Sequence, residues 1–152
     1  MPVRPPTSDD VETIGAIADA TGLFPSELLP DLIAGFLAPE PSEDRWLVRE
    51  AGGRVVGFCY AVPEQLADGT WNMLAIGVEP SRQGGGIGGD LTAGLEEDLR
   101  DAGARILLAD TSGTDAFRRT RRFYAERGYE EEARIRDFWA DGDDKVTFRK
   151  AL

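Results

Sequence analysis

The stretch WNMLAIGVEPSRQGGGIGGDLTAGLEEDLR, residues 71–100, decides the fold of this chain. Residues 74–78 are apolar at both odd and even positions, which predicts a strand covered on both of its faces. Pro80 ends that strand, because proline has no amide to donate to a neighbouring strand. A glycine-rich loop follows, and leucines at every fourth position from Leu91 to Leu99 predict an amphipathic helix. The stretch therefore reads as strand, loop and helix.

The glycine-rich loop predicts a binding site for a phosphate or pyrophosphate group. Glycines between Gly84 and Gly89 remove side chains that would hold a ligand away from the backbone. The loop leads into a helix N-terminus, where unpaired amides and the helix dipole both favour an anion. A Walker loop is excluded, because Asp90 stands where its hydroxyl residue should be and no lysine precedes it. A dinucleotide-binding protein stays open, since the glycines also fit GxGxxG and Asp110 follows at about the expected distance.

Two segments resemble a known family. The pattern Val78-x-Pro80-x-x-Gln83-x-x-Gly86-x-Gly88 looks like the acetyl-CoA signature of the GNAT (general amine N-acetyltransferase) superfamily. The segment FYAERGY, residues 123–129, resembles that family's FYxxxGF segment. The resemblance implies a single GNAT-type acyltransferase domain over residues 1–152. Its fold class is α/β, with a mixed, mostly antiparallel central sheet of six to seven strands flanked by about four helices.

The resemblance also implies an activity and a set of cofactor-binding residues. A GNAT-like enzyme moves an acetyl group from acetyl-CoA, its cosubstrate, to a primary amine by direct attack in a ternary complex. The acceptor is a small-molecule amine, or else a peptide or protein amine. Phe117 and Thr120 depart from the asparagine and alanine that the family often carries there, which weakens any side-chain contact to pantetheine from this helix. The residues assigned to acetyl-CoA are Ile76, Gly77, Val78, Arg82, Gln83, Gly84, Gly85, Gly86, Ile87, Gly88, Gly89, Thr111, Phe123, Tyr124 and Arg127.

Catalytic roles fall to a tyrosine and to polar residues near the central strand. Tyr124 matches the family tyrosine that faces the CoA sulfur. A phenol with a pKa of about 10 can give a proton to a departing thiolate. The alternative is that Tyr124 only packs in the core. Glu64, Asp68 and Asn72 are candidates to receive the amine proton or to hold a water, and no spacing rule selects among them. Gly77 predicts a bulge, because glycine inside a strand often marks an irregularity.

Composition limits the remaining possibilities. The chain has 152 residues and a net charge of −11, which argues against a nucleic-acid partner. Such a charge would attract a cationic amine, although general solubility is the preferred explanation for it. It has no histidine, so a catalytic zinc or other metal site is not expected. Its single cysteine, Cys59, fits a reducing cytoplasm and an inert core position. No leader and no membrane-spanning segment are expected, and a homodimer is plausible. A non-catalytic acyl-CoA-binding module is the alternative function.

The rest of the chain predicts alternating elements that complete one domain. Five arginines crowd the segment 118–127, a natural counter-charge for phosphates on an acidic protein. Phe138 and Trp139 are candidates for one wall of the acceptor cleft. The other elements are expected as a short strand at 3–6, helices at 11–21, 24–37 and 115–127, and strands at 45–50, 54–62, 105–110, 129–136 and 145–149.

Overall fold

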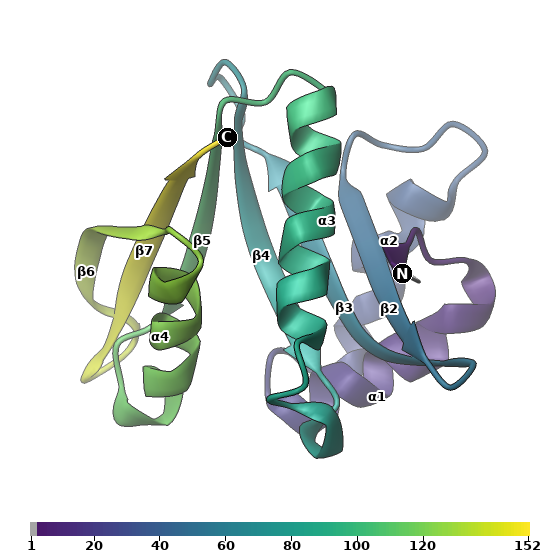
Figure 1. Ribbon diagram of the computed structural model, residues 1–152, viewed down its shortest axis with the longest axis horizontal. Helices are drawn as coiled ribbons and strands as arrows, with labels where there is room; N and C mark the ends of the chain where they lie inside the picture. Colours follow the sequence, from purple (N-terminus) through teal and green to yellow (C-terminus); the bar gives the residue numbers. More distant parts are fainter. Residues whose placement is uncertain (1–2) are drawn as a thin grey trace.

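A computed structural model describes residues 3–152 and shows one mixed sheet of seven strands in the order β1-β2-β3-β4-β5-β7-β6 (Figure 1). Only β4 and β5 run parallel; the other neighbouring pairs are antiparallel. The predicted fold class is confirmed. The strands are β1 (Val3–Arg4), β2 (Arg45–Ala51), β3 (Arg54–Pro63), β4 (Thr70–Val78), β5 (Ile106–Ser112), β6 (Glu130–Ala140) and β7 (Asp143–Ala151).

Helices cover both faces of this sheet and divide its core in two. α3 (Ile87–Asp101) and α4 (Arg118–Glu126) lie on one face, while α1 (Val11–Thr21) and α2 (Leu29–Leu37) lie on the other (Figure 1). The leucines that predicted α3 are fully buried, and each such side chain stabilises the fold by about 1.5–3 kcal/mol. Short 3₁₀ turns precede the helices at Ser8–Asp10, Ser26–Leu28, Pro80–Arg82 and Asp115–Phe117.

The parallel strands β4 and β5 separate part-way along their length. They pair only where Thr70–Met73 faces Ile106–Ala109. Past Met73, β4 continues to pair with β3 and β5 continues to pair with β7, so the two strands diverge (Figure 1). We call the divergence between their facing backbone edges the slot. The backbone edges that face this slot carry polar groups with no strand partner, and a ligand can use them.

The irregularity that starts this separation lies at Leu74, so the predicted bulge at Gly77 is wrong. Tyr60 pairs with Ala75 and Ala61 pairs with Met73, which leaves Leu74 as the extra residue of β4. Gly77 instead pairs regularly with Phe58. A Cβ at Gly77 would lie 2.8 Å from Leu23 Cδ1 and 3.1 Å from Phe58 Cε1. Glycine stands there because the α1 side of the core packs tightly against the strand.

Candidate active site

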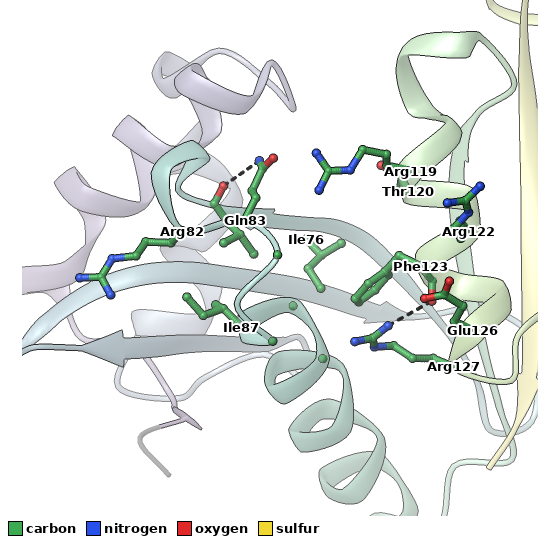
Figure 2. A pocket seen from close by; sticks show the side chains of 15 residues that line it. Ile76, Arg82, Gln83, Ile87, Arg119, Thr120, Arg122, Phe123, Glu126 and Arg127 are labelled. Carbon is green, nitrogen blue, oxygen red and sulfur yellow. Dashed lines mark hydrogen bonds between the residues drawn. The ribbon is translucent and has the colours of Figure 1, made fainter.

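A groove of about 550 Å³ lies between the N-terminus of α3 and the side of α4 (Figure 2). Its floor is the end of β4, and its walls come from the glycine-rich loop and from α4, which the sequence separates by about thirty residues. Most of the residues assigned to acetyl-CoA from the sequence are together here. Those that line the groove are Ile76, Val78, Arg82, Gln83, Gly84, Gly86, Ile87, Gly88, Gly89, Phe123 and Arg127.

The glycine-rich loop presents a row of free hydrogen-bond donors to this groove. Within the described residues, the amides of 84–89 donate to no protein acceptor, and the first helical bond runs from Asp90 N to Gly86 O at 3.0 Å. Gly86 caps α3, a helix of 15 residues whose positive dipole end faces the same space. Asp90 would oppose an anion, but Arg49 pairs with its carboxylate at 2.9 Å. The loop therefore suits a phosphate group.

The glycines of this loop serve two different needs. Gly84 and Gly86 adopt φ values of 85° and 84°, the left-handed region that side chains disfavour. Gly88 and Gly89 instead let α4 approach, since a Cβ at Gly88 would lie 3.1 Å from the Phe123 ring and one at Gly89 would lie 2.6 Å from Arg127 Nη2. The sequence predicts only that these glycines let a ligand approach the backbone closely. Only the fold shows that Gly88 and Gly89 also lie at the contact between α3 and α4.

Positive side chains gather around the groove of an otherwise acidic protein. Arg82, Arg119 and Arg122 line it, and none of them pairs with a carboxylate among residues 3–152 (Figure 2). The Arg127 guanidinium lies 3.9 Å from the centroid of the Phe123 ring, a cation–π contact that holds both side chains in place. The arginine cluster was expected near phosphates, but Arg119 and Arg122 were not assigned to the site. Their place depends on which face of α4 turns toward α3.

Tyr124 is buried directly beside the groove and does not line it. Its side chain is 2% exposed, and its ring packs against Phe123, Tyr129 and Phe148 at centroid distances of 5.4, 5.5 and 5.4 Å. Burial raises the pKa of the Tyr124 phenol above its ordinary value, and the nearby Asp110 charge acts in the same direction. The phenol therefore keeps its proton throughout the physiological range.

Cys59 is fully buried, and burial raises the pKa of its thiol to about 12. A thiol with such a pKa carries no significant thiolate at neutral pH, so the expectation of an inert core position is confirmed.

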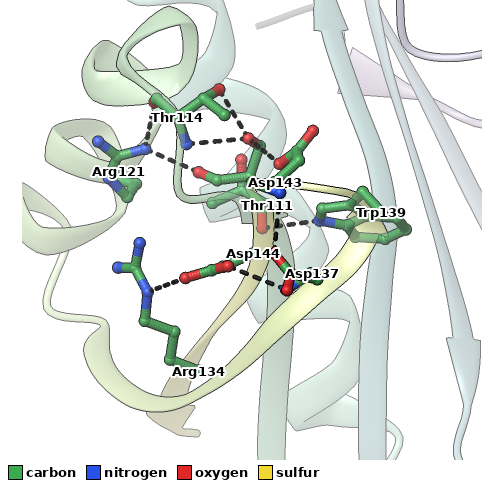
Figure 3. A network of polar contacts seen from close by, with 10 residues as sticks. Thr111, Thr114, Arg121, Arg134, Asp137, Trp139, Asp143 and Asp144 are labelled. Carbon is green, nitrogen blue, oxygen red and sulfur yellow. Dashed lines mark hydrogen bonds and ion pairs between the residues drawn. The ribbon is translucent and has the colours of Figure 1, made fainter.

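Besides Tyr124, three of the residues assigned to acetyl-CoA, Gly77, Gly85 and Thr111, lie outside the lining of the groove. The Thr111 carbonyl oxygen accepts a hydrogen bond of 3.2 Å from Trp139 Nε1 (Figure 3). In the same network, Arg121 Nη1 donates to the carbonyl oxygens of Ser112 and Thr114, both at 2.7 Å. These bonds tie the end of β5 and the loop after it to α4, and the end of β5 to β6, and so they fix where α4 stands.

A second polar cluster lies where β4 and β5 separate, on the sheet face opposite α3. Asn72 Nδ2 donates to Glu64 Oε1 at 3.2 Å and to Asp110 Oδ2 at 3.0 Å. The Asp110 carboxylate also accepts from Thr147 Oγ1 at 2.7 Å and pairs with Lys145 Nζ at 3.5 Å. Sequence reasoning singled out Glu64 and Asn72 but missed their link to Asp110. That link depends on the register of the parallel pair, in which Asn72 faces Leu108.

Comparison with known proteins identifies the family. Residues 16–129 match the acetyltransferase (GNAT) family. The chain belongs to this family. A GNAT acetyltransferase from Desulfovibrio desulfuricans superposes with a TM-score of 0.90 at 28% identity, covering 98% of this chain and 97% of that one. An acetyltransferase from Salmonella typhimurium, solved with acetyl-CoA, gives a TM-score of 0.81 at 20% identity over 99% of this chain and 92% of that one.

A curated relative of this GNAT chain is the mycothiol acetyltransferase of Sanguibacter keddieii. The two are 31% identical over 115 residues, which is 71% of this chain and 36% of the relative. The chain thus spans about a third of that relative's length. Within residues 3–152, no group of three or more histidine, cysteine, aspartate or glutamate side chains is placed to hold a metal ion, and no helix is long and apolar enough to cross a membrane.

Proposed function

We propose that this GNAT chain transfers the acetyl group of acetyl-CoA to a primary amine by direct attack in a ternary complex. The observation that carries the proposal is the groove itself. Free loop amides and unpaired arginines form one end of it, and β4 at its floor leads to the slot between β4 and β5. A long ligand with an anionic end and a thin, mostly apolar arm fits such a shape. Acetyl-CoA has that form.

Each part of the cosubstrate has a matching part of the site. The amides of 84–89 would hold the pyrophosphate, and Arg119 and Arg122 would offset the remaining phosphate charge. The pantetheine arm would lie in the slot that begins at Leu74. Backbone groups of β4 past Met73 face that slot without a strand partner, and an amide among them would polarise the thioester carbonyl.

The acyl transfer balances with one proton donor at the sulfur. The amine nitrogen attacks the thioester carbonyl carbon, a C–N bond forms, and the C–S bond breaks. The nitrogen releases a proton to solvent, and the CoA thiolate gains one from the Tyr124 hydroxyl, which solvent then reprotonates. Burial keeps the Tyr124 phenol protonated at neutral pH, and desolvation of the departing thiolate would raise the pKa of the CoA thiol and so favour the transfer.

Thermal-shift titration with acetyl-CoA, CoA, NAD and ATP tests which ligand binds at the glycine-rich loop. A ligand at a hundredfold excess over its Kd stabilises the folded chain by about 2.7 kcal/mol. We expect stabilisation by acetyl-CoA and CoA. A response to NAD alone would refute the proposal in favour of a dinucleotide-binding protein, and binding of CoA with no amine-dependent thiol release would indicate a non-catalytic acyl-CoA-binding module.

The role of Tyr124 is tested by Tyr124→Phe in an assay of thiol release. Removing a general acid is expected to lower kcat by about 10²-fold or more while KM for acetyl-CoA stays near the wild-type value. Tyr129→Phe is the comparison variant, because it removes a buried phenol of the same aromatic cluster, one whose hydroxyl donates to Glu96 at 2.8 Å. Equal kcat losses in the two variants would show that Tyr124 only packs in the core.

The predictions of a cytoplasmic location and of a homodimer remain to be tested, the second by a sizing column.

A further inference from the structure

The first turn of α3 is a weak start for a helix. Gly88 and Gly89 lie in it, where a Cβ would meet the side chain of Phe123 or of Arg127. A glycine inside a helix destabilises it by about 0.5–1 kcal/mol relative to alanine. Asp90 is the acidic residue of the same turn, and a carboxylate near a helix N-terminus stabilises the helix by about 0.3–1 kcal/mol. Asp90 therefore offsets part of the cost of the two glycines in the chain without a ligand.

The same carboxylate works against a phosphate ligand. The free amides of residues 84–89 and the dipole of α3 attract an anion, and a negative charge directly after that loop cancels part of the attraction. Asp90 lies outside the lining of the groove, so its charge acts on a ligand through space and without a contact. An acid at this position needs a counter-charge if the loop is to bind a phosphate group well.

Arg49 supplies that counter-charge from the sheet. It lies on β2, where its Nε donates to Asp90 Oδ2 at 2.9 Å and its Nη1 donates to the carbonyl oxygen of Glu50. The Arg49 side chain is only 12% exposed, so solvent and salt screen this ion pair less than a pair on the open surface. Like Asp90, Arg49 lies outside the lining of the groove. Its effect on an anion in the groove is therefore indirect.

A glycine of the sheet brings Arg49 within reach of α3. Gly57 on β3 pairs with Arg49 across the strands, so the two residues share one face of the sheet. A Cβ at Gly57 would lie 2.9 Å from Ile87 Cγ2 and 3.1 Å from Leu91 Cδ1. Because that Cβ is missing, the first turn of α3 rests directly on β3 beside Arg49. This close packing buries the Arg49 side chain behind the loop.

A second ion pair borders the loop at its other end and differs in exposure. Arg54 belongs to the same β2–β3 hairpin, and its Nη2 donates to Glu79 Oε2 at 2.7 Å. The Arg54 side chain is 57% exposed, and exposed ion pairs contribute only about 0–1 kcal/mol. The two pairs have the same chemistry and come from the same hairpin, so Arg54 offers a comparison in which only burial differs strongly.

We propose that Arg49 is a positioning residue of the acetyl-CoA site, which neutralises Asp90 from behind α3 and so keeps the loop attractive to phosphate. The proposal rests on the acetyl-CoA binding proposed above and names a residue that sets its affinity without touching the cosubstrate. Asp90 supports the start of α3 in the free chain, and Arg49 prevents that support from weakening the bound state. No local sequence pattern indicates this pair, because its members are 41 positions apart.

A double-mutant cycle on CoA binding, measured by calorimetry, tests this role. Arg49→Gln should weaken CoA binding about tenfold at low salt and less at high salt, because it leaves Asp90 without a counter-charge. Asp90→Asn should bind CoA at least as tightly as the wild type. The double variant should return to within about twofold of the wild type, because it removes both charges. Arg54→Gln is the matched control and should also stay within about twofold, because its ion pair is exposed.

Three results would overturn the proposal. A double variant that binds CoA as weakly as Arg49→Gln would show that Arg49 acts on the ligand or on the fold directly. Weaker binding by Asp90→Asn would show that its charge does not oppose the ligand, and this variant decides the question even where Arg49→Gln does not fold. A loss in Arg54→Gln equal to that in Arg49→Gln would refute the argument from burial.

Steady-state kinetics separate the electrostatic role from a structural one. In Arg49→Gln, KM for acetyl-CoA should rise about tenfold while kcat stays unchanged. KM for S-acetylpantetheine, which carries no phosphate, should not change. An equal rise for both thioesters would show a structural defect and overturn the proposal.

The same cycle with inorganic pyrophosphate separates the role of Arg49 from the proposed function. The same order of affinities for pyrophosphate, in a chain that does not bind CoA, would uphold the action of Arg49 on the loop and refute the proposed use of acetyl-CoA. A wild-type chain that binds neither pyrophosphate nor CoA would overturn both.

Discussion

Glu96 is expected to hold the two helices of the groove in register, and its removal offers a quantitative test. It lies on α3, is 6% exposed, and accepts from the Tyr129 hydroxyl and from Lys150 Nζ, both at 2.8 Å. Tyr129 directly follows the turn that ends α4, and Lys150 lies on β7 and also donates to Arg127 O at 2.9 Å. One carboxylate thus links α3, the end of α4 and the sheet.

The cost of Glu96→Ala follows from these contacts. Breaking a buried ion pair by removing one partner costs about 3–5 kcal/mol, much of it because the other charge is left unpaired. Lys150 is 23% exposed and keeps its bond to Arg127, so the cost should fall at the lower end of that range. We therefore expect the free energy of unfolding to drop by about 3 kcal/mol. For a domain of this size, that lowers Tm by about 6–12 °C.

Urea unfolding followed by circular dichroism measures this loss. The midpoint should fall while the m-value stays constant, since the same surface is exposed on unfolding. Glu97→Ala is the matched control, because Glu97 is the next residue of α3 and faces solvent; it should change stability by less than about 0.5 kcal/mol. If Glu96→Ala lowers the free energy of unfolding no more than Glu97→Ala does, the Glu96 carboxylate does not hold α3 to the end of α4.

Two further expectations concern charge. Arg122→Ala should weaken CoA binding about fivefold, the equivalent of about 1 kcal/mol for one partly screened charge, and the effect should be smaller at high salt. Arg118→Ala is the control and should change CoA binding little, because the Arg118 side chain already pairs with Asp115 at 2.9 Å. Calorimetry at two salt concentrations compares the two variants. Hydrogen bonds from Arg4 hold the pKa of the Asp10 carboxyl below its ordinary value, so the stability they contribute is present above about pH 4 and lost as the pH falls through the lowered pKa. Arg4→Met should therefore destabilise the fold at pH 7 and lose its effect in acid; an equal effect of the substitution at pH 7 and at low pH would contradict this.

Much of the fold and half of the site were predictable because the signals are local. A strand, a proline and a run of glycines before an amphipathic helix depend on neighbours in the chain, and so does the segment ending at Tyr129. These signals gave the mixed sheet, the groove residues from Arg82 to Gly89, and α4. They also placed Glu64 and Asn72 among the candidates for the acceptor side.

Tertiary structure decided what depends on register and on the facing of elements. Residue type alone predicts a bulge at Gly77, but the strand register makes Leu74 the extra residue. Glycine stands at 77 because Leu23 and Phe58 leave no room for a Cβ. Asp110 joins Asn72 across 38 positions through the pairing of two parallel strands. No local pattern records such a pairing, since its free energy comes from side chains that meet only when the sheet forms. The sequence by itself determined the family and its glycine-rich loop, and the packed sheet decided that the Glu64 and Asp110 carboxylates meet at Asn72.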